Sequence, residues 1–353
     1  MTDISKHADA VVSTEGLSRE DWLEYRRAGI GGSDVAAIKG VSRYTSPYAL
    51  WANKRGLDSL DSGNAATQWG NDLELVVAQR FAKDYDATVI AVPILLRSKT
   101  NPFMLANLDF VIVNSEENPQ FPRGEVTTWD LSLKALPLIE SILEIKTTGI
   151  ASRGNAAGWE NGSVPEAYEL QGHHYALVTG CEAVVFAALV GGKGLVVAGR
   201  LYNSPEKDAA LIETERTFWN LVETGEAPEV DGSESTTETL KNLYPESVED
   251  VVVIADDFVA DTLEEYRRTK KELDELDKKT KALRNRLEAA IGSGESLYYN
   301  DVKVATFKST KPSEKVNTEA LLDYLRSEFP GLIENYTEVR PGYRVLRLTK
   351  VSE

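Results

Sequence analysis

The stretch Ser141-Ile-Leu-Glu-Ile-Lys-Thr147 is the feature that most constrains what this chain can fold into. Its short apolar run is typical of a buried strand. Two ionisable residues, Glu144 and Lys146, interrupt the run two positions apart. Because side chains alternate across a strand, both point to the same face, where a carboxylate and an ammonium lie side by side. Taken alone, they are either a structural ion pair or half of a reactive site.

The composition is that of a globular protein, with 353 residues, 42% of them hydrophobic and 27% charged. This length allows one large domain or two. The sequence has no run of about 18 apolar residues, which a membrane span needs, and residues 1–13 show no secretory signal pattern. A single cysteine, Cys181, excludes an intramolecular disulfide and a cysteine-based metal cluster. These features predict a reducing, cytoplasmic location.

The net charge of −17 is unevenly distributed along the chain. From Asp256 onward there are 18 basic and 19 acidic residues, which leaves 21 basic and 37 acidic residues in the first 255. An acidic surface repels nucleic acid, so the charge argues against a protein that coats DNA regardless of sequence. A local basic groove, or an acidic metal site that acts on a phosphate, remains compatible with this charge.

The order of elements predicts an α/β fold with a mixed central sheet flanked by helices. Helices are expected at 19–28, 35–39, 48–55, 68–84, 165–179 and 205–224, and strands at 88–96, 103–113, 141–147, 183–189 and 195–202. Loops are expected at 57–65 and 149–164, and a turn at 191–194. The polar stretch 114–137 contains three prolines and is expected to be an irregular insertion before the central strand.

We expect three regions: a flexible N-terminus at 1–17, a core at 18–225 and a C-terminal extension at 226–353. Within the extension, apolar residues of the segment 257–291 recur at spacings of three, four and seven. This pattern predicts either a coiled-coil arm or a solvated helix that packs on its own domain. Beyond it, a pair of strands is expected at 297–308, a helix at 317–328 and a final strand at 343–349.

Three carboxylates in this order suggest a metal site. Asp109 lies in the apolar stretch 103–113, where a lone carboxylate costs several kcal/mol unless it is paired or binds a metal. Glu74 lies beside the apolar stripe of the helix at 68–84, and Glu144 is the third acid. Clustered carboxylates raise one another's pKa unless a cation neutralises them, and hard oxygen ligands favour Mg²⁺ or Mn²⁺. Such a cation with Lys146 would support hydrolysis of a phosphodiester.

The motifs then resemble those of a known superfamily. Asp109 followed by Glu144-Ile-Lys146 resembles the (P)D-(D/E)xK signature of restriction-endonuclease-like nucleases. Gln171-Gly-His-His-Tyr175 is similar to the Gln-x-x-x-Tyr motif of the RecB-like branch. The block from Arg27 to Gly40, followed by Tyr44, Ser46-Pro47 and Leu50-Trp51, resembles the signature of YqaJ-type viral recombinases, which are alkaline exonucleases similar to lambda exonuclease.

This resemblance implies a restriction-endonuclease-like core and a Mg²⁺-dependent 5′→3′ exonuclease, with Mn²⁺ as a substitute. Such an enzyme degrades one strand of linear double-stranded DNA from an end and leaves a 3′ overhang for phage-type homologous recombination. The resemblance also implies a trimeric ring, a single-strand annealing protein as partner and, for a phage protein, the host cytoplasm.

The resemblance assigns a role to each matching residue. The metal ligands would be Glu74, Asp109, Glu144 and the carbonyl of Ile145. Lys146 would be catalytic, together with Glu144 and Asp109, and Gln171 would support them. Arg27 and Ser33 would hold the terminal 5′-phosphate, with Tyr175 also on the DNA-binding side. The glycine turn before Ser33 suits that role because backbone N–H groups can approach an anion there.

Several features depart from the family pattern. Asp109 and Glu144 are 35 positions apart, which is longer than usual in the family. Asn107 stands in place of the proline of the pattern, at a position that varies widely in the family. Glu125 and Asp130 lie in the insertion and are alternative ligands. For His173 and His174, core or solvent contacts are expected rather than a metal. Two other functions stay open: a catalytically silent adaptor that binds DNA ends, and an endonuclease of the same superfamily.

Overall fold

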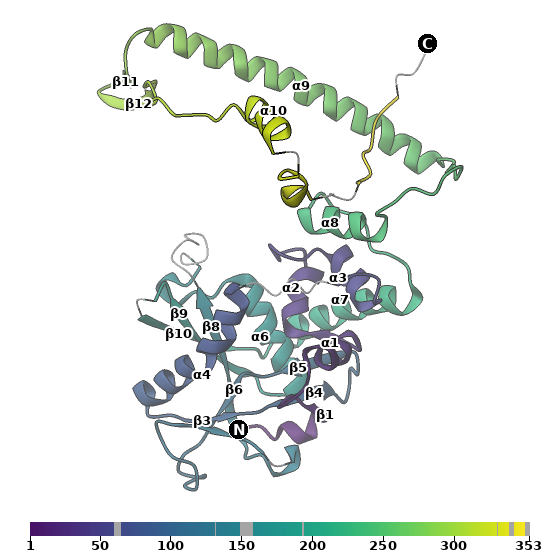
Figure 1. The fold of residues 1–353 in the computed structure, drawn as a ribbon. Helices are drawn as coiled ribbons and strands as arrows, with labels where there is room; N and C mark the ends of the chain where they lie inside the picture. The colour runs from purple at the N-terminus through teal and green to yellow at the C-terminus, as the bar shows by residue number, and fades with distance from the viewer. Residues whose placement is uncertain are drawn as a thin grey trace. The chain divides into compact units, whose positions relative to one another are not determined.

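The computed structural model describes residues 1–59, 65–130, 132–148, 158–192, 194–329, 331–338 and 342–349. The chain divides into two compact units, Met1–Pro245 and Glu246–Glu353 (Figure 1). The first unit thus extends beyond residue 225, where the sequence placed the end of the core. It includes the helix α8 (Glu234–Leu243), in which Thr236 is buried and donates a hydrogen bond to Ser46 Oγ (2.8 Å).

The first unit is built around a six-stranded mixed sheet, which confirms the predicted α/β class. In spatial order its strands are β10 (Gly194–Leu201), β9 (Ala183–Val190), β8 (Ile139–Thr148), β6 (Phe110–Val113), β3 (Thr88–Ala91) and β7 (Val126–Thr128). The pairs β8/β9 and β3/β7 are parallel, and the other neighbours are antiparallel. The central strand is the one that carries Glu144 and Lys146.

A second, four-stranded sheet takes up segments that the sequence assigned differently. Its order is β1 (Ala8–Ser13), β4 (Ile94–Ser98), β5 (Met104–Asn107) and β2 (Ile30–Gly31). The single strands expected at 88–96 and 103–113 are wrong, because each one breaks and its two halves join different sheets. The first break falls at Val92-Pro93, where proline has no N–H for the ladder, and the second at Leu108-Asp109. Residues 1–17, expected to be flexible, contain η1 (Ile4–Lys6) and β1.

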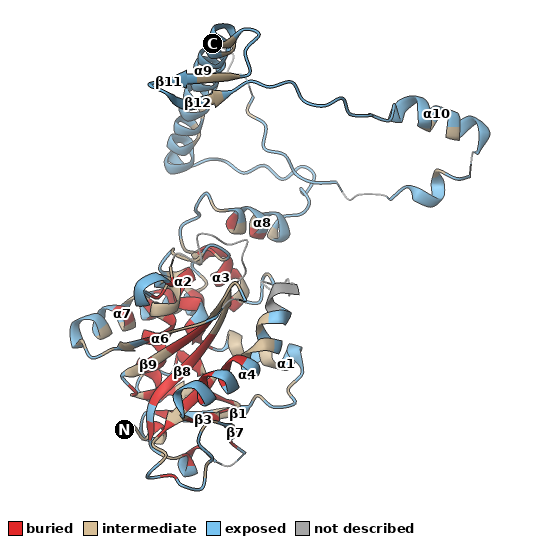
Figure 2. Cartoon of the chain, turned by 90° about the vertical axis from the view of Figure 1, so that its left-hand side faces the viewer, coloured by how far each residue is buried: buried red, intermediate tan, exposed pale blue. Residues whose placement is uncertain are grey.

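Helices cover the six-stranded sheet on both faces (Figures 1 and 2). Besides α8, the described helices of the first unit are α1 (Arg19–Arg27), α2 (Val35–Ile38), α3 (Pro47–Lys54), α4 (Ala65–Tyr85), α6 (Glu166–Thr179) and α7 (Pro205–Thr224), and two of its 3₁₀ turns are η2 (Gly32–Asp34) and η4 (Glu160–Gly162). They agree with the helices expected from the sequence. For α1, α3 and α7 the sequence shows the N-cap, a serine in each case; the hydroxyl of Ser18, for example, accepts from the amide of Asp21 (3.1 Å).

The two faces of the sheet belong to two different hydrophobic clusters. Leu143 and Ile145 of β8 pack with Val77 and Phe81 of α4. Ile142 of β8 belongs to the other cluster, which also contains residues of α6 and α7. The strand alternation inferred from the sequence therefore places Glu144 and Lys146 on the α6 face.

The insertion at 114–137 is more ordered than the sequence suggested. It contributes β7 to the sheet edge and a 3₁₀ turn, η3 (Leu133–Ala135). Trp129 and Leu133 are buried in the main cluster, which anchors the insertion to the first unit. The expected loops at 57–65 and 149–164 lie partly outside the described residues.

The second unit contains the predicted long helix, α9 (Asp257–Ile291), and the predicted hairpin, β11 (Ser296–Tyr299) with β12 (Val302–Thr306). The helix α10 (Thr318–Glu328) and the turn η5 (Glu334–Tyr336) follow. The final strand expected at 343–349 is wrong, since the structure describes these residues without a strand. Among the described residues, no helix combines the length and the apolar character needed to cross a membrane.

Candidate nuclease site

Strand register brings Asp109 and Glu144 together. Phe110 of β6 pairs with Leu143 of β8 in an antiparallel ladder, so Asp109 lies opposite Glu144 just beyond the end of β6. The Oδ2 atom of Asp109 accepts a hydrogen bond from the backbone amide of Ile145 (2.9 Å). The break between β5 and β6 therefore places the Asp109 carboxylate next to the backbone of the central strand β8.

Glu144 is fully buried, with 0% of its surface exposed. Its Oε1 atom accepts hydrogen bonds from Lys146 Nζ (2.5 Å) and from Gln171 Nε2 (2.6 Å). Its Oε2 atom is buried without a hydrogen-bond partner. Burial, with the neighbouring charge of Asp109, raises the pKa of Glu144 to about 8. One oxygen is thus held in place while the other is available to a further ligand.

Lys146 stays charged at this site. Burial disfavours its ammonium, but the Glu144 and Asp109 carboxylates outweigh burial and raise the pKa of Lys146. Its Nζ atom also lies 5.1 Å from the centre of the Tyr168 ring, a cation–π distance. The predicted pair of strand neighbours is therefore an ion pair in the structure, with Lys146 held between a carboxylate and an aromatic ring.

Glu74 reaches the same site from α4. Burial and the charge of Asp109 raise the pKa of Glu74 to about 7, and Lys146 opposes this rise. Burial likewise raises the pKa of Asp109. The three carboxylates singled out in the sequence are therefore electrostatically coupled.

These carboxylates fit a divalent cation in their chemistry. Among the described residues, no three His, Cys, Asp or Glu side chains form a ready-made ion-binding cluster. The fit rests instead on the repulsion among Glu74, Asp109 and Glu144 and on the unpartnered, buried Oε2 of Glu144. A cation would remove that repulsion and satisfy that oxygen.

A basic cavity adjoins the acids. Its volume is about 680 Å³, and Glu74 and Asp109 line it together with several cationic side chains. The cationic side chains are Arg19, Arg26, Arg27 and Lys54, from α1 and α3. Acidic and basic side chains therefore line one cavity.

The buried carboxylate of Asp34 organises this basic wall. Its Oδ1 accepts from Arg26 Nη2 (2.9 Å), and its Oδ2 lies 2.6 Å from Lys54 Nζ and accepts from the amide of Gly31 (2.9 Å). Burial opposes ionisation, but Lys54 and Arg26 outweigh it and lower the pKa of Asp34 to about 2. Asp34 thus fixes a lysine, an arginine and the glycine turn at once.

A second arginine lies beside the predicted phosphate-binding residues Arg27 and Ser33. Arg26 Nη2 donates to Ser33 Oγ (2.8 Å). Arg27 lines the same cavity, and its Nε is buried without a partner. Sequence reasoning missed Arg26, Asp34 and Lys54. The available signal was Lys54 at the end of an otherwise largely apolar helix, because a buried ammonium needs a carboxylate.

Gln171 and Tyr175 link the two halves of the site. They lie one turn apart on α6, and Gln171 Nε2 donates to Tyr175 Oη (3.1 Å) as well as to Glu144. Tyr175 is only 5% exposed and packs against Gly32, where an added Cβ would lie 2.6 Å from Tyr175 Cε1. Tyr175, which was predicted to lie on the DNA-binding side, is thus packed beneath the glycine turn.

The two histidines make core contacts, as predicted. His174 is fully buried, with Nδ1 2.9 Å from Glu215 Oε1 and Nε2 2.8 Å from the carbonyl oxygen of Leu105. His173 Nε2 lies 2.6 Å from Asp208 and its ring stacks on Tyr202. Their hydrogen bonds hold α6 against β5 and α7.

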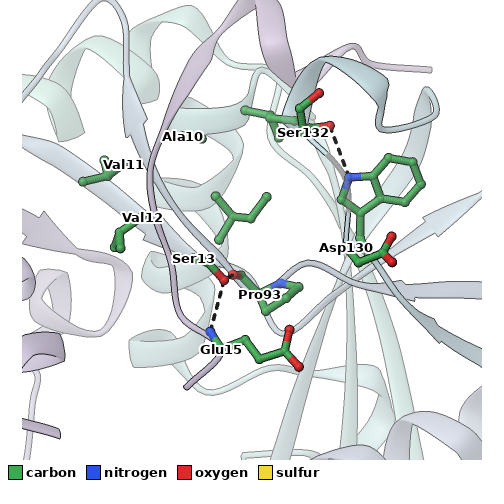
Figure 3. A pocket seen from close by; sticks show the side chains of 11 residues that line it. Ala10, Val11, Val12, Ser13, Glu15, Pro93, Asp130 and Ser132 are labelled. Atoms are coloured by element: carbon green, nitrogen blue, oxygen red, sulfur yellow. Dashed lines mark hydrogen bonds between the residues drawn. The ribbon is translucent and has the colours of Figure 1, made fainter. Parts of the chain in front are cut away.

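The alternative acids of the insertion lie elsewhere. Glu125 is exposed next to the edge strand β7. Asp130 is exposed and lines a separate cavity of about 290 Å³ with Ser13, Glu15 and Pro93 (Figure 3). Neither contributes to the charge coupling of Glu144. Glu74 therefore remains the third acid of the site.

Comparison with known proteins identifies the family. The uncharacterized protein YqaJ of Bacillus subtilis (strain 168) is 31% identical over 338 residues, which cover 94% of this chain and 94% of that protein. This chain belongs to the YqaJ family. The family model described as the YqaJ-like viral recombinase domain matches residues 21–182 of this YqaJ-family chain. That range contains every predicted site residue.

Other similar proteins cover less of the chain or resemble it less. A protein of African swine fever virus (strain Badajoz 1971 Vero-adapted) is 38% identical over 55 residues, 16% of each chain. The crystal structure of the alkaline exonuclease LHK-Exo from Laribacter hongkongensis has a TM-score of 0.43 at 15% identity and covers 58% of this chain and 93% of its own. Its complex with dAMP has the same TM-score at 18% identity.

Proposed function

We propose that this YqaJ-family protein is a metal-dependent 5′→3′ exonuclease on linear double-stranded DNA. Its product would be the 3′ single-stranded overhang that homologous recombination uses. One observation carries this proposal: the coupled acids Glu74 and Asp109 line the same cavity as Arg26, Arg27 and Lys54. A phosphodiester next to the acids and a terminal phosphate next to the basic wall would occupy one continuous space.

The proposed ligands of Mg²⁺ or Mn²⁺ are Glu74, Asp109, Glu144 and the carbonyl oxygen of Ile145. When bound, the cation would supply a water of lowered pKa and stabilise charge on the phosphate. The amide of Ile145 already holds Asp109, and because the N–H and C=O of one residue point to the same side of an extended strand, its carbonyl oxygen faces the side from which Asp109 approaches. The chain's own contribution is to hold these oxygens in a fixed arrangement.

Lys146 would stabilise negative charge as it develops in the reaction, since its ammonium is held charged beside Glu144. Gln171 would keep the Glu144 carboxylate in one orientation by donating to Oε1. Because the other oxygen of Glu144 has no partner, this orientation presents Oε2 to the incoming ligand.

The basic wall would hold the terminal 5′-phosphate through Arg26, Arg27 and Ser33. Arg26 and Ser33 are already hydrogen-bonded to each other, and the amide-rich glycine turn lies beside them. This site would give a preference for phosphorylated ends. A trimeric ring and an annealing protein as partner are further predictions of the family resemblance.

The test uses linear duplex DNA with and without a 5′-phosphate, and closed circular DNA, each incubated with protein and Mg²⁺. Loss of the linear substrate alone, faster with the phosphate, is the expected result. Cutting of circles would indicate an endonuclease, and binding without metal-dependent loss of DNA would indicate a silent adaptor.

The catalytic assignment has its own variant. Lys146→Ala is expected to abolish hydrolysis and to leave DNA binding largely unchanged, whereas Lys207→Ala, which removes an exposed lysine of α7, is the matched control. Hydrolysis at the full rate by Lys146→Ala would refute the mechanism.

A further inference from the structure

The long helix α9 of the second unit has no buried face. All of its residues, Asp257–Ile291, are described and none is buried. Leu273 and Leu276, in the middle of the helix, are 57% and 58% exposed, and Leu283 and Leu287 are 49% and 52% exposed. A helix of this length, about 50 Å, does not keep such an apolar stripe in water without a partner.

The stripe follows a heptad pattern over five repeats, with apolar residues at seven of its ten a and d positions and threonine at the other three. Starting at Val259, the chain can be read with alternating steps of three and four as far as Ala290. The a positions are Val259, Tyr266, Leu273, Thr280 and Leu287, and the d positions are Thr262, Thr269, Leu276, Leu283 and Ala290. A continuous seam of this kind is typical of a coiled coil and specifies another helix as its partner.

The charges of α9 divide the helix into two halves of opposite sign. Residues 257–277 contain eight acidic and four basic side chains, whereas residues 278–291 contain five basic and one acidic. Acidic residues near the N-terminus and basic residues near the C-terminus also suit the helix dipole. That effect is confined to the terminal turns, so it does not explain the charges in the middle of the helix.

The positions that flank the seam distinguish between two orientations. At the g positions lie Glu265, Glu272, Lys279 and Arg286, and at the charged e positions lie Lys270, Asp277 and Arg284. In a parallel pair, g contacts the e position five residues later, which would place Glu272 against Asp277 and Lys279 against Arg284. Two of the three charged contacts would therefore be repulsive.

An antiparallel pair reverses this result. With Leu273 of one helix level with Leu276 of the other, g residues face g residues and e residues face e residues. Glu265 then meets Arg286, Glu272 meets Lys279, and Lys270 meets Asp277. Every contact between two charged flanking residues is attractive, and the same register keeps all ten seam positions in layers.

We propose that α9 pairs with α9 of a second copy of this chain as an antiparallel coiled coil. The contact is self-complementary, with its two-fold axis between Leu273 and Leu276, as expected for a symmetric dimer. The partner is assigned by charge complementarity, since each half of the helix is the electrostatic match of the other half. The proposal does not depend on the nuclease site and is tested without DNA.

The first test measures the mass of the full-length protein by sedimentation velocity over a range of concentrations. The wild type is expected to form dimers through α9. If the first unit by itself assembles into a ring, α9 is expected to join one ring to another. Lys279→Glu turns both contacts with Glu272 from attraction to repulsion, so we expect a dissociation constant about tenfold higher. Lys281→Glu makes the same change in net charge at a b position outside the seam and is the matched control.

The outcomes separate the possible partners. A parallel pair would be strengthened by Lys279→Glu, because the introduced carboxylate would then face Arg284, and this result would overturn the proposal. So would a wild type that stays monomeric, or an oligomer whose mass does not change in the variant, since the seam would then serve another protein or nothing.

The second test fixes the orientation by disulfide formation. Thr269 and Thr280 are level with each other only in the antiparallel pair. A mixture of Thr269→Cys and Thr280→Cys proteins is therefore expected to cross-link on mild oxidation, while each variant alone is not. Cross-linking within either variant alone would show a parallel pair. The natural Cys181 is buried, and the wild type serves as the control.

Discussion

Replacing Asp34 by Asn tests whether the basic wall is organised by one buried charge. The substitution keeps the shape of the side chain and removes its charge. Lys54, whose side chain is only 2% exposed, would then be left without its carboxylate, and Arg26 would lose one of its two hydrogen-bonded partners. The structure therefore predicts both a loss of stability and a loss of order in the basic wall.

The magnitude follows from the ion pair of Asp34 with Lys54 and Arg26. The fall in the pKa of Asp34 from 3.8 to about 2 corresponds to about 2 kcal/mol of stability at neutral pH. Because Asp34→Asn also leaves Lys54 buried without a carboxylate partner, the expected loss in free energy of unfolding rises to about 3–5 kcal/mol. Burial lowers the pKa of Lys54 by more than Asp34 raises it, and replacing a buried ion pair by apolar side chains is often neutral or stabilising. Asp34→Asn with Lys54→Met is therefore expected to recover most of the loss.

The assay is urea unfolding followed by tryptophan fluorescence. All six tryptophans lie in the first 219 residues, so this signal reports on the first unit alone. Asp84→Asn, which breaks an exposed ion pair with Arg80, is the control and should cost less than about 1 kcal/mol. A similarly small cost for Asp34→Asn, or a double variant as unstable as Asp34→Asn alone, would refute the reasoning.

Three other predictions concern the same unit. Gln171→Ala removes a donor to Glu144 Oε1 and should lower kcat at least about tenfold with little change in KM, measured as release of nucleotides from linear DNA. Activity equal to that of the wild type would exclude the orienting role of Gln171. Gly32→Ala places a Cβ 2.6 Å from Tyr175 and should destabilise the first unit by about 1–3 kcal/mol in the same urea assay. An unchanged midpoint of urea unfolding would contradict this prediction. Because the folded-state pKa of Asp34 is lowered, its stabilising contribution is complete above about pH 4 and disappears as the pH falls towards about 2. The difference in stability between the wild type and Asp34→Asn should therefore shrink over that range. A constant difference would show that ionisation of Asp34 is not the source of the stabilisation.

The sequence predicted the parts of this fold that depend on local pattern. Long helices with visible caps, such as α7 and α9, were assigned close to their true ends because the period and the caps agree. The strands at 88–96 and 103–113 were wrong because each has an apolar run that continues across a break. Only the pairing of strands in the folded protein shows that the two halves of each run belong to different sheets, although Pro93 marked the first break in the sequence.

The sequence singled out the acids of the candidate site because their chemistry is unusual for their positions. Glu144 and Asp109 stand out as charges within apolar stretches, and Gln171 through the motif on the next helix. Arg26 could not be chosen over Arg27, because neighbouring residues on a helix point in different directions and only the three-dimensional path of the glycine turn shows which one meets Ser33. The seam of α9 was visible as a period, but its orientation required the flanking charges.

The antiparallel pairing of β6 with β8 has a consequence for how this family can change. The separation of Asp109 and Glu144 in space is set by the ladder in which Phe110 pairs with Leu143, not by the 35 positions between them. The connection at 114–137 leaves the far end of β6 and returns at the far end of β8. The distance between the two carboxylates thus does not depend on the length of this connection, so additions at its exposed positions, such as Glu116 and Glu117, are expected to leave both carboxylates in place, whereas β7 and the buried Trp129 and Leu133 must stay.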